Sequence, residues 1–162
     1  MTDKQNKDSL SFDNQLPHPW SDVIKAVWMK YPNVKIPEVL YEKVISIERT
    51  EQGFTVTKLK QAYKVFKPVK IYSLSTYDFK FESQVLNYRE EVVKGAIKGL
   101  FPPLEISKYS ARDLDSVEYT KTFFNLGSFK LWKSKFMQKN LEGVEILKEL
   151  ITHKQWLMLA LN

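Results

Sequence analysis

Apolar residues recur every three or four positions in the stretch PWSDVIKAVWMKYPN, residues 19–33, as they do along one side of a helix. The pattern predicts a helix over residues 21–31, and its buried stripe would consist of Trp20, Val23, Ile24, Val27, Trp28 and Tyr31. Ser21 can cap the start of this helix, and Pro32 favours its end. Lys25 points away from the apolar stripe, whereas Lys30 borders it.

Between residues 39 and 126 the apolar period changes to two, which is typical of strands. Six segments show this alternation: 39–49, 54–63, 69–81, 85–93, 104–113 and 116–126. The glycine in TEQGFT and the residues at 113–115 predict the turns of two hairpins. In the third segment the odd-numbered positions from Ile71 to Phe81 share one face.

Helical periodicity returns from about residue 128 to residue 151. The stripe contains Asn140 and Gly143 among its apolar residues, and a glycine there weakens a helix but lets it approach a sheet closely. The order of elements predicts an α+β fold. We expect a curved antiparallel sheet of about six to seven strands, with an N-terminal helix and a long C-terminal helix that can enclose a cavity.

The length of 162 residues and the apolar content of 43% predict one domain with its own core. We assign residues 1–18 to a polar N-terminal tail, residues 19–151 to the domain and residues 152–162 to an apolar C-terminal extension. The first residues, MTDKQNKDSLSFDNQ, resemble neither a secretory signal nor a mitochondrial presequence, so we expect no cleaved signal. No apolar run is long enough to span a bilayer.

The composition indicates which kinds of site and partner to expect. Cysteine is absent and histidine occurs only at positions 18 and 153, so we expect no metal site. No phosphate-binding glycine loop, nucleophile elbow or His–Glu metal motif is present, so we expect a protein that is not an enzyme. The net charge of +6 comes mostly from lysine, which favours diffuse attraction to anions such as lipid headgroups over sequence-specific binding of nucleic acid.

Two lysine clusters contain no acidic residue. One consists of Lys58, Lys60, Lys64, Lys67 and Lys70, and the other of Lys130, Lys133, Lys135 and Lys139. Each is either an ordinary solvated face or part of a basic rim around a cavity mouth, where it would attract an anionic headgroup or a membrane. The residues alone leave both interpretations open.

The stretch at residues 19–33 resembles the opening of the PRELI/MSF1 family through Trp20, Trp28, Lys30 and the tripeptide Tyr31-Pro32-Asn33. Weaker similarities follow in VISIER, TKLK, VFKPV, LEISKYS and WKSKF, so the resemblance covers about residues 12–151. The chain departs from the family pattern by its added N-terminal tail and apolar C-terminal extension, and by two shortened segments. The segment between Leu59 and Tyr72 is short, which truncates the lid, and the last helix is about one turn shorter.

This resemblance implies a START-like fold that encloses a lipid cavity. It also implies that Lys30 and Lys58 face a lipid phosphate, that Lys133 or Lys135 contributes from the last helix, and that the lid contains Phe66, Lys67 and Pro68. Family members move phosphatidic acid or phosphatidylserine between mitochondrial membranes and pair with a small helical twin-CX9C protein. The one ligand that this resemblance implies is a bound phospholipid, and we expect no cofactor.

Two functions are consistent with these features. The first is PRELI-like phospholipid binding and transfer, of phosphatidic acid or a similar anionic lipid, at membrane surfaces of the mitochondrial intermembrane space. The alternative is a structural accessory subunit of a mitochondrial inner-membrane complex, the respiratory chain or ATP synthase, in which the apolar segment WLMLAL would be a docking surface. Nucleic acid is not expected as a partner, because no stacking-platform motif is present.

Overall fold

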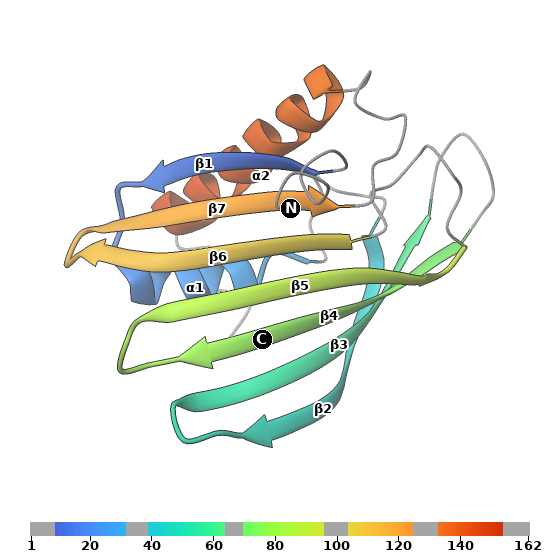
Figure 1. Cartoon of the computed structure of the whole chain (residues 1–162), viewed down its shortest axis with the longest axis horizontal. Helices are drawn as coiled ribbons and strands as arrows, with labels where there is room; N and C mark the ends of the chain where they lie inside the picture. Colours follow the sequence, from blue (N-terminus) through green and yellow to red (C-terminus); the bar gives the residue numbers. More distant parts are fainter. Residues whose placement is uncertain (1–8, 32–38, 64–69, 96–103, 125–132, 154–162) are drawn as a thin grey trace, which may run out of the picture.

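A computed structural model describes residues 9–31, 39–63, 70–95, 104–124 and 133–153 of the chain. Its elements, in order, are β1 (Leu10–Leu16), α1 (Trp20–Trp28), β2 (Val39–Arg49), β3 (Gly53–Tyr63), β4 (Lys70–Lys80), β5 (Val85–Lys94), β6 (Leu104–Asp113), β7 (Ser116–Phe124) and α2 (Lys133–His153). The strands form one antiparallel sheet in the order β1-β7-β6-β5-β4-β3-β2 (Figure 1). The predicted α+β class, with a seven-stranded curved sheet and a long C-terminal helix, is confirmed.

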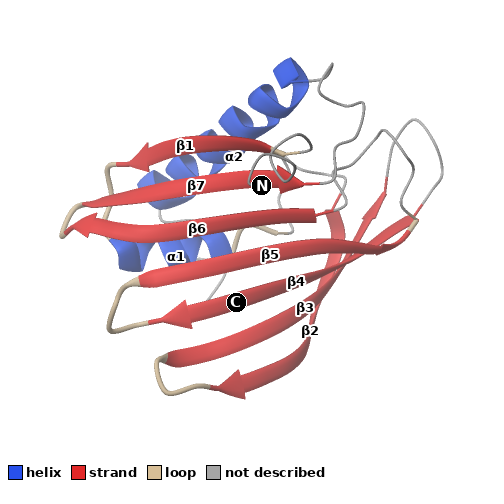
Figure 2. Cartoon of the chain, in the orientation of Figure 1, coloured by secondary structure: helices blue, strands red, loops and turns tan. Residues whose placement is uncertain are grey.

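Both helices lie on the same side of the sheet, towards the end that carries β1 (Figure 2). Along β4 the odd-numbered residues Ile71, Ser73, Ser75 and Tyr77 are buried, as the alternating pattern predicts. The main core joins this face to α1 and to the C-terminal half of α2. Leu16, Val23, Leu86 and Val117 are completely buried in this core.

The prediction that residues 1–18 form a tail is wrong for residues 10–16. This segment is strand β1, which pairs with β7 over its whole length. Phe12 packs edge-on against Phe123, with their ring centroids 6.1 Å apart, and Leu16 is fully buried. The chain therefore enters the sheet before the first helix, and α1 is not the first element of the fold.

The first helix begins and ends earlier than predicted. It runs from Trp20 to Trp28, its N-cap residue is Pro19, and no side chain caps its start, so Ser21 does not have the expected role. Met29 is the C-cap residue of the helix, and its amide donates to the carbonyl oxygen of Lys25. Tyr31 thus lies beyond the helix. Neither described helix combines the length and apolar character needed to cross a bilayer.

Several predicted features fall outside the described residues. These are the lid residues Phe66, Lys67 and Pro68, the first part of the predicted last helix at residues 128–132, and most of the apolar extension, residues 154–162.

Candidate functional site

Charged side chains line the helix-facing side of the sheet where an apolar core would be expected. Lys58 and Lys60 on β3 and Lys121 on β7 are each only 6% exposed. Each lysine forms an ion pair with a carboxylate of another strand: Lys58 with Glu42, Lys60 with Glu90, and Lys121 with Glu105. We call these six residues, together with Lys30, the charged cluster.

The Lys60–Glu90 pair is the most completely hydrogen-bonded pair of the cluster. Ser73 Oγ donates to one Glu90 oxygen at 2.9 Å, and Tyr88 Oη donates to the other at 3.0 Å. Burial alone would raise the pKa of Glu90, but the Lys60 ammonium and these hydrogen bonds outweigh it and lower the pKa below its usual range. Glu90 is therefore ionised at neutral pH.

The Lys121–Glu105 pair joins β7 to β6, with a distance of 3.2 Å between Lys121 Nζ and Glu105 Oε1. Burial would lower the pKa of Lys121, but the Glu105 carboxylate raises it above its usual value. Ser107 Oγ also donates to Glu105, at 3.5 Å. Lys121 is therefore a permanent cation within the protein.

The charged form of the Lys58–Glu42 pair is less strongly stabilised than that of the other two pairs. Lys58 Nζ lies 3.3 Å from Glu42 Oε2, donates to the carbonyl oxygen of Trp28 at 3.4 Å, and lies 3.5 Å from the centroid of the Trp28 ring. Burial lowers the pKa of Lys58 and raises that of Glu42, and each partner offsets only part of this shift. Lys58 therefore ties α1 to β3, and its ammonium already has a carboxylate partner.

Lys30 differs from the other lysines of the cluster. It follows the end of α1 and is half-buried, and no residue in the described part of the chain forms an ion pair with it. Burial, together with the positive charges of Lys121 and Lys60, lowers the pKa of Lys30 to about 7. Its ammonium group lies 5.3 Å from the centroid of the Tyr31 ring.

Gly143 of α2 faces the space between two of these ammonium groups. A Cβ atom at this position would lie 3.5 Å from Lys30 Nζ and 3.7 Å from Lys121 Nζ. The missing side chain leaves a place that both cations approach and that no side chain of α2 occupies. An oxyanion at this place could accept hydrogen bonds from both lysines.

The position of α2 over the cluster is fixed by an amide pair. Asn14 Nδ2 donates to Asn140 Oδ1 at 3.0 Å, and Asn140 Nδ2 donates back to Asn14 Oδ1 at 3.1 Å. Asn140 is one turn before Gly143 and is 3% exposed. The pair therefore joins β1 to the turn of α2 that faces Lys30 and Lys121.

The structure brings together some of the predicted site residues. Lys30 and Lys58 both belong to the charged cluster, although Lys58 is paired with Glu42. Lys133 and Lys135 lie in the first turn of α2, and their side chains lie outside the described residues. The assignment of these four lysines to lipid binding therefore stays a prediction.

Sequence reasoning missed Lys121 and the three carboxylates. A signal for Lys121 was present, because it follows Val117 and Tyr119 at the buried positions of an alternating strand. A lysine at such a position must have a partner or a function. The partners themselves could not be read from the sequence, because Glu105 and Glu90 are brought near by strand pairing.

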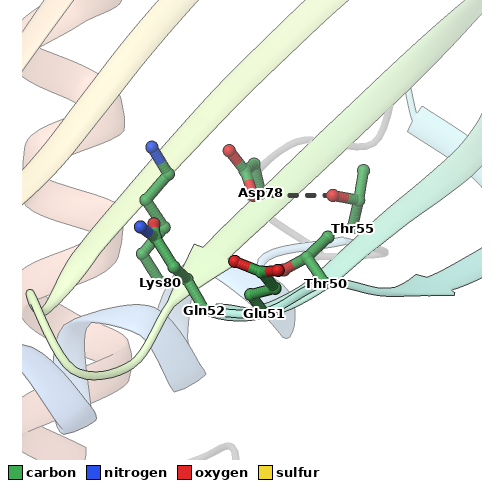
Figure 3. A pocket seen from close by; sticks show the side chains of 6 residues that line it. All are labelled: Thr50, Glu51, Gln52, Thr55, Asp78 and Lys80. Carbon is green, nitrogen blue, oxygen red and sulfur yellow. Dashed lines mark hydrogen bonds between the residues drawn. The ribbon is translucent and has the colours of Figure 1, made fainter.

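A separate hollow of about 370 Å³ lies at the turn between β2 and β3 (Figure 3). It is open and polar, and Thr55 Oγ1 donates across it to Asp78 Oδ1 at 3.5 Å. Its lining consists of Thr50, Glu51, Gln52, Thr55, Asp78 and Lys80, none of which was a predicted site residue. Among the described residues, no group of carboxylates and histidines could hold a metal ion.

No protein-family profile and no curated protein sequence matches this chain. Solved structures do match it in fold. Human STARD10 is 10% identical with a TM-score of 0.60, covering 96% of this chain and 68% of that one. Ara h 8.0201 is 15% identical with a TM-score of 0.60, covering 90% and 99%. The Zhui aromatase/cyclase from Streptomyces sp. R1128 is 8% identical with a TM-score of 0.59, covering 90% and 94%.

Identities this low establish the fold and nothing finer. One of these structures is named as an enzyme, so the fold does not decide between binding and catalysis. The matches also carry no sign of the PRELI/MSF1 family in particular. What they show is that this chain has the START-like fold, in which a curved antiparallel sheet wraps against a long C-terminal helix.

Proposed function

We propose that this chain binds an amphiphilic ligand through an anionic headgroup, and that the ligand is a phospholipid such as phosphatidic acid. The observation that carries the proposal is the place beside Gly143, which the Lys30 and Lys121 ammonium groups both approach. A phosphate there would accept charge-assisted hydrogen bonds from two lysines that a START-like fold holds in position.

The charge balance of the cluster supports an anionic ligand. Four lysines, Lys30, Lys58, Lys60 and Lys121, face three carboxylates, and Lys30 is the one that forms no ion pair with a carboxylate of the described residues. A bound anion would offset the excess positive charge.

Apolar side chains lie next to the cluster, which favours an amphiphile over a free anion. Phe123 and Phe136 form a small buried cluster with Leu10 and Phe12 packed against it. Lys121 Nζ lies 5.7 Å from the centroid of the Phe123 ring, so the charged and apolar parts adjoin. An apolar chain attached to a phosphate at Lys121 would pack against these side chains in place of part of their present contacts, because Phe123 and Phe136 are only 1% and 7% exposed.

Lipid binding can be measured by native mass spectrometry after incubation with vesicles of phosphatidic acid and phosphatidylcholine. We expect one phosphatidic acid per chain. Lys30→Met should weaken binding roughly ten- to hundredfold, the effect of losing a hydrogen bond between charged groups. Gly143→Ala should weaken it as well without unfolding the protein, because its methyl group would make ordinary contacts while occupying the proposed phosphate place.

Lys108→Met is the matched control, because Lys108 is exposed on β6 and is not part of the cluster. Its binding should equal that of the wild type. Equal binding by Lys30→Met and wild type would contradict the headgroup assignment. Binding of phosphatidylcholine as tight as that of phosphatidic acid would contradict the anionic specificity.

The finer functions rest on the sequence resemblance. We propose that the chain transfers such lipids between membranes of the mitochondrial intermembrane space, with a small twin-CX9C protein as its partner. The alternative proposal is an accessory subunit of an inner-membrane complex. Transfer between donor and acceptor vesicles by the purified protein would support the first proposal, and stable co-purification with a large assembly, without transfer, would support the second.

A further inference from the structure

Strand β2 is an open edge of the sheet with an unusually apolar surface. It is eleven residues long and pairs with β3 on one side, and no described strand pairs with its other side (Figure 1). Tyr41, Ile45 and Ile47 are 47%, 52% and 65% exposed. The opposite edge, β1, has seven residues, and its exposed positions are polar. An edge like β2 is a template for pairing with another strand.

Two register shifts interrupt the pairing of β2 with β3, one between Val39 and Tyr41 and one between Val44 and Ser46, and the second is a bulge near the middle of the strand. Val44 pairs with Lys58 and Ser46 with Thr57, so Ile45 has no partner in β3. The extra residue reverses the alternation of faces. Before it, Glu42 and Val44 share the face of the buried lysines of β3. After it, Ile47 and Arg49 share that face, because they pair with Val56 and Phe54.

This reversal selects one register for a second copy of β2. Two copies related by a two-fold axis perpendicular to the sheet would be antiparallel, and paired residues must then lie on the same face. Glu42, Val44, Ile47 and Arg49 can all satisfy this rule in only one register, which pairs residues 42–49 of the two copies and in which Ile45 lies opposite Ser46 of the other copy. The bulge thus lies at the centre of the pairing.

In the same register, oppositely charged residues of the two copies lie opposite each other. The register was selected from the faces of the residues alone, so the charges are an independent observation. On the outer face, Lys43 of each copy lies opposite Glu48 of the other. On the inner face, Val44 lies opposite Ile47, and Glu42 opposite Arg49. Because of the two-fold symmetry every pair occurs twice. Opposite charges directly across an antiparallel pair stabilise it, and like charges destabilise it.

We infer that β2 is a homodimerisation edge, through which two copies of this chain form one continuous sheet. Lys43, Glu48 and Arg49 are exposed, and no described residue of the same chain forms an ion pair with any of them. Glu42 is turned towards Lys58, so the Lys43–Glu48 pairs carry most of the charge complementarity. Each charge has its complement within the same strand, which identifies the partner as a second copy.

Sedimentation equilibrium of the full chain, over a range of concentrations, tests the inference. A single strand edge buries little area, so we expect a reversible dimer that dissociates on dilution. Lys43→Glu places like charges opposite each other twice and should raise the dissociation constant roughly tenfold. The charge-swapped double variant Lys43→Glu/Glu48→Lys restores opposite pairs and should recover the wild-type dissociation constant.

Lys108→Glu makes the same charge change on the exposed face of β6 and should leave the dissociation constant unchanged. In hydrogen exchange, the outward-facing amides of β2 should be protected at high concentration and exchange faster on dilution. A chain that is monomeric at every concentration would overturn the inference. So would a dimer that Lys43→Glu leaves intact, or one that the charge swap fails to restore.

Discussion

Lys30 is the residue whose charge conflicts most with its surroundings. Its pKa is lowered to about 7 in the folded protein by burial and by neighbouring lysines, whereas the ordinary value of 10.5 applies to the unfolded chain. Between these two values the unfolded state binds more protons, so the Lys30 contribution makes stability rise with pH. The protonated Lys30 side chain destabilises the folded protein fully below about pH 7, and this destabilisation disappears above pH 10.5.

Replacing Lys30 by methionine should remove this pH dependence. We expect Lys30→Met to raise the free energy of unfolding of the ligand-free protein on the order of 1 kcal/mol at about pH 6, because a desolvated cation is lost. The gain should shrink towards about pH 9. Urea unfolding at both pH values measures it, with Lys108→Met as the control. A gain that does not depend on pH would mean that burial does not lower the pKa of Lys30 in the folded protein.

At the scale of single elements, the amide pair between Asn14 and Asn140 joins β1 to α2. Asn140→Ala would leave the half-buried Asn14 amide without this partner, so we expect a loss of about 1–3 kcal/mol in the free energy of unfolding. The double variant Asn14→Ala/Asn140→Ala should lose less than the sum of the two single variants. Chemical denaturation of the four proteins completes the cycle, and strictly additive losses would show that the two amides do not stabilise each other.

Local sequence patterns predicted most of the helices and strands. The strand that was missed depends on contacts with residues far away in the sequence. The predicted strands at 39–49 and 104–113 coincide with β2 and β6, because alternation is a property of adjacent residues. Strand β1 was missed because its polar residues at 11, 13 and 15 resemble a tail. What makes it a strand is pairing with β7, which is distant in the sequence.

The same distinction between local and non-local information applies to the candidate site. The helical pattern placed Lys30 at the border of the apolar stripe, and the family resemblance predicted that both Lys30 and Lys58 face a phosphate. The ion pairs depend on the register of β3, β5, β6 and β7, which no local pattern contains. The proposed phosphate place depends on Gly143 facing Lys30 and Lys121. The sequence indicated only that this glycine would let a helix approach the sheet.

At the scale of the whole molecule, positive charge acts in two places that salt affects differently. The chain carries a net charge of +6, which would attract it to anionic membranes across solvent, while the charged cluster lies inside the protein. Screening lengths fall from about 30 Å at about 0.01 M salt to about 3 Å at about 1 M, whereas buried pairs are screened much less. Membrane association and ligand retention should therefore respond differently to salt.

We expect high salt to release the protein from anionic vesicles without removing a lipid already bound. Vesicle flotation measures association, and native mass spectrometry of the protein recovered from each salt concentration measures the retained lipid. Lys30→Met should show the opposite separation. It removes one of the chain's many positive charges, which hardly changes the attraction to vesicles, but it also removes one of the two lysines that approach Gly143 among the described residues. It should float with vesicles almost as well as the wild type and retain much less lipid. Lipid lost at the same salt concentration as membrane association would place the anion on the solvated surface instead of beside Lys30 and Lys121.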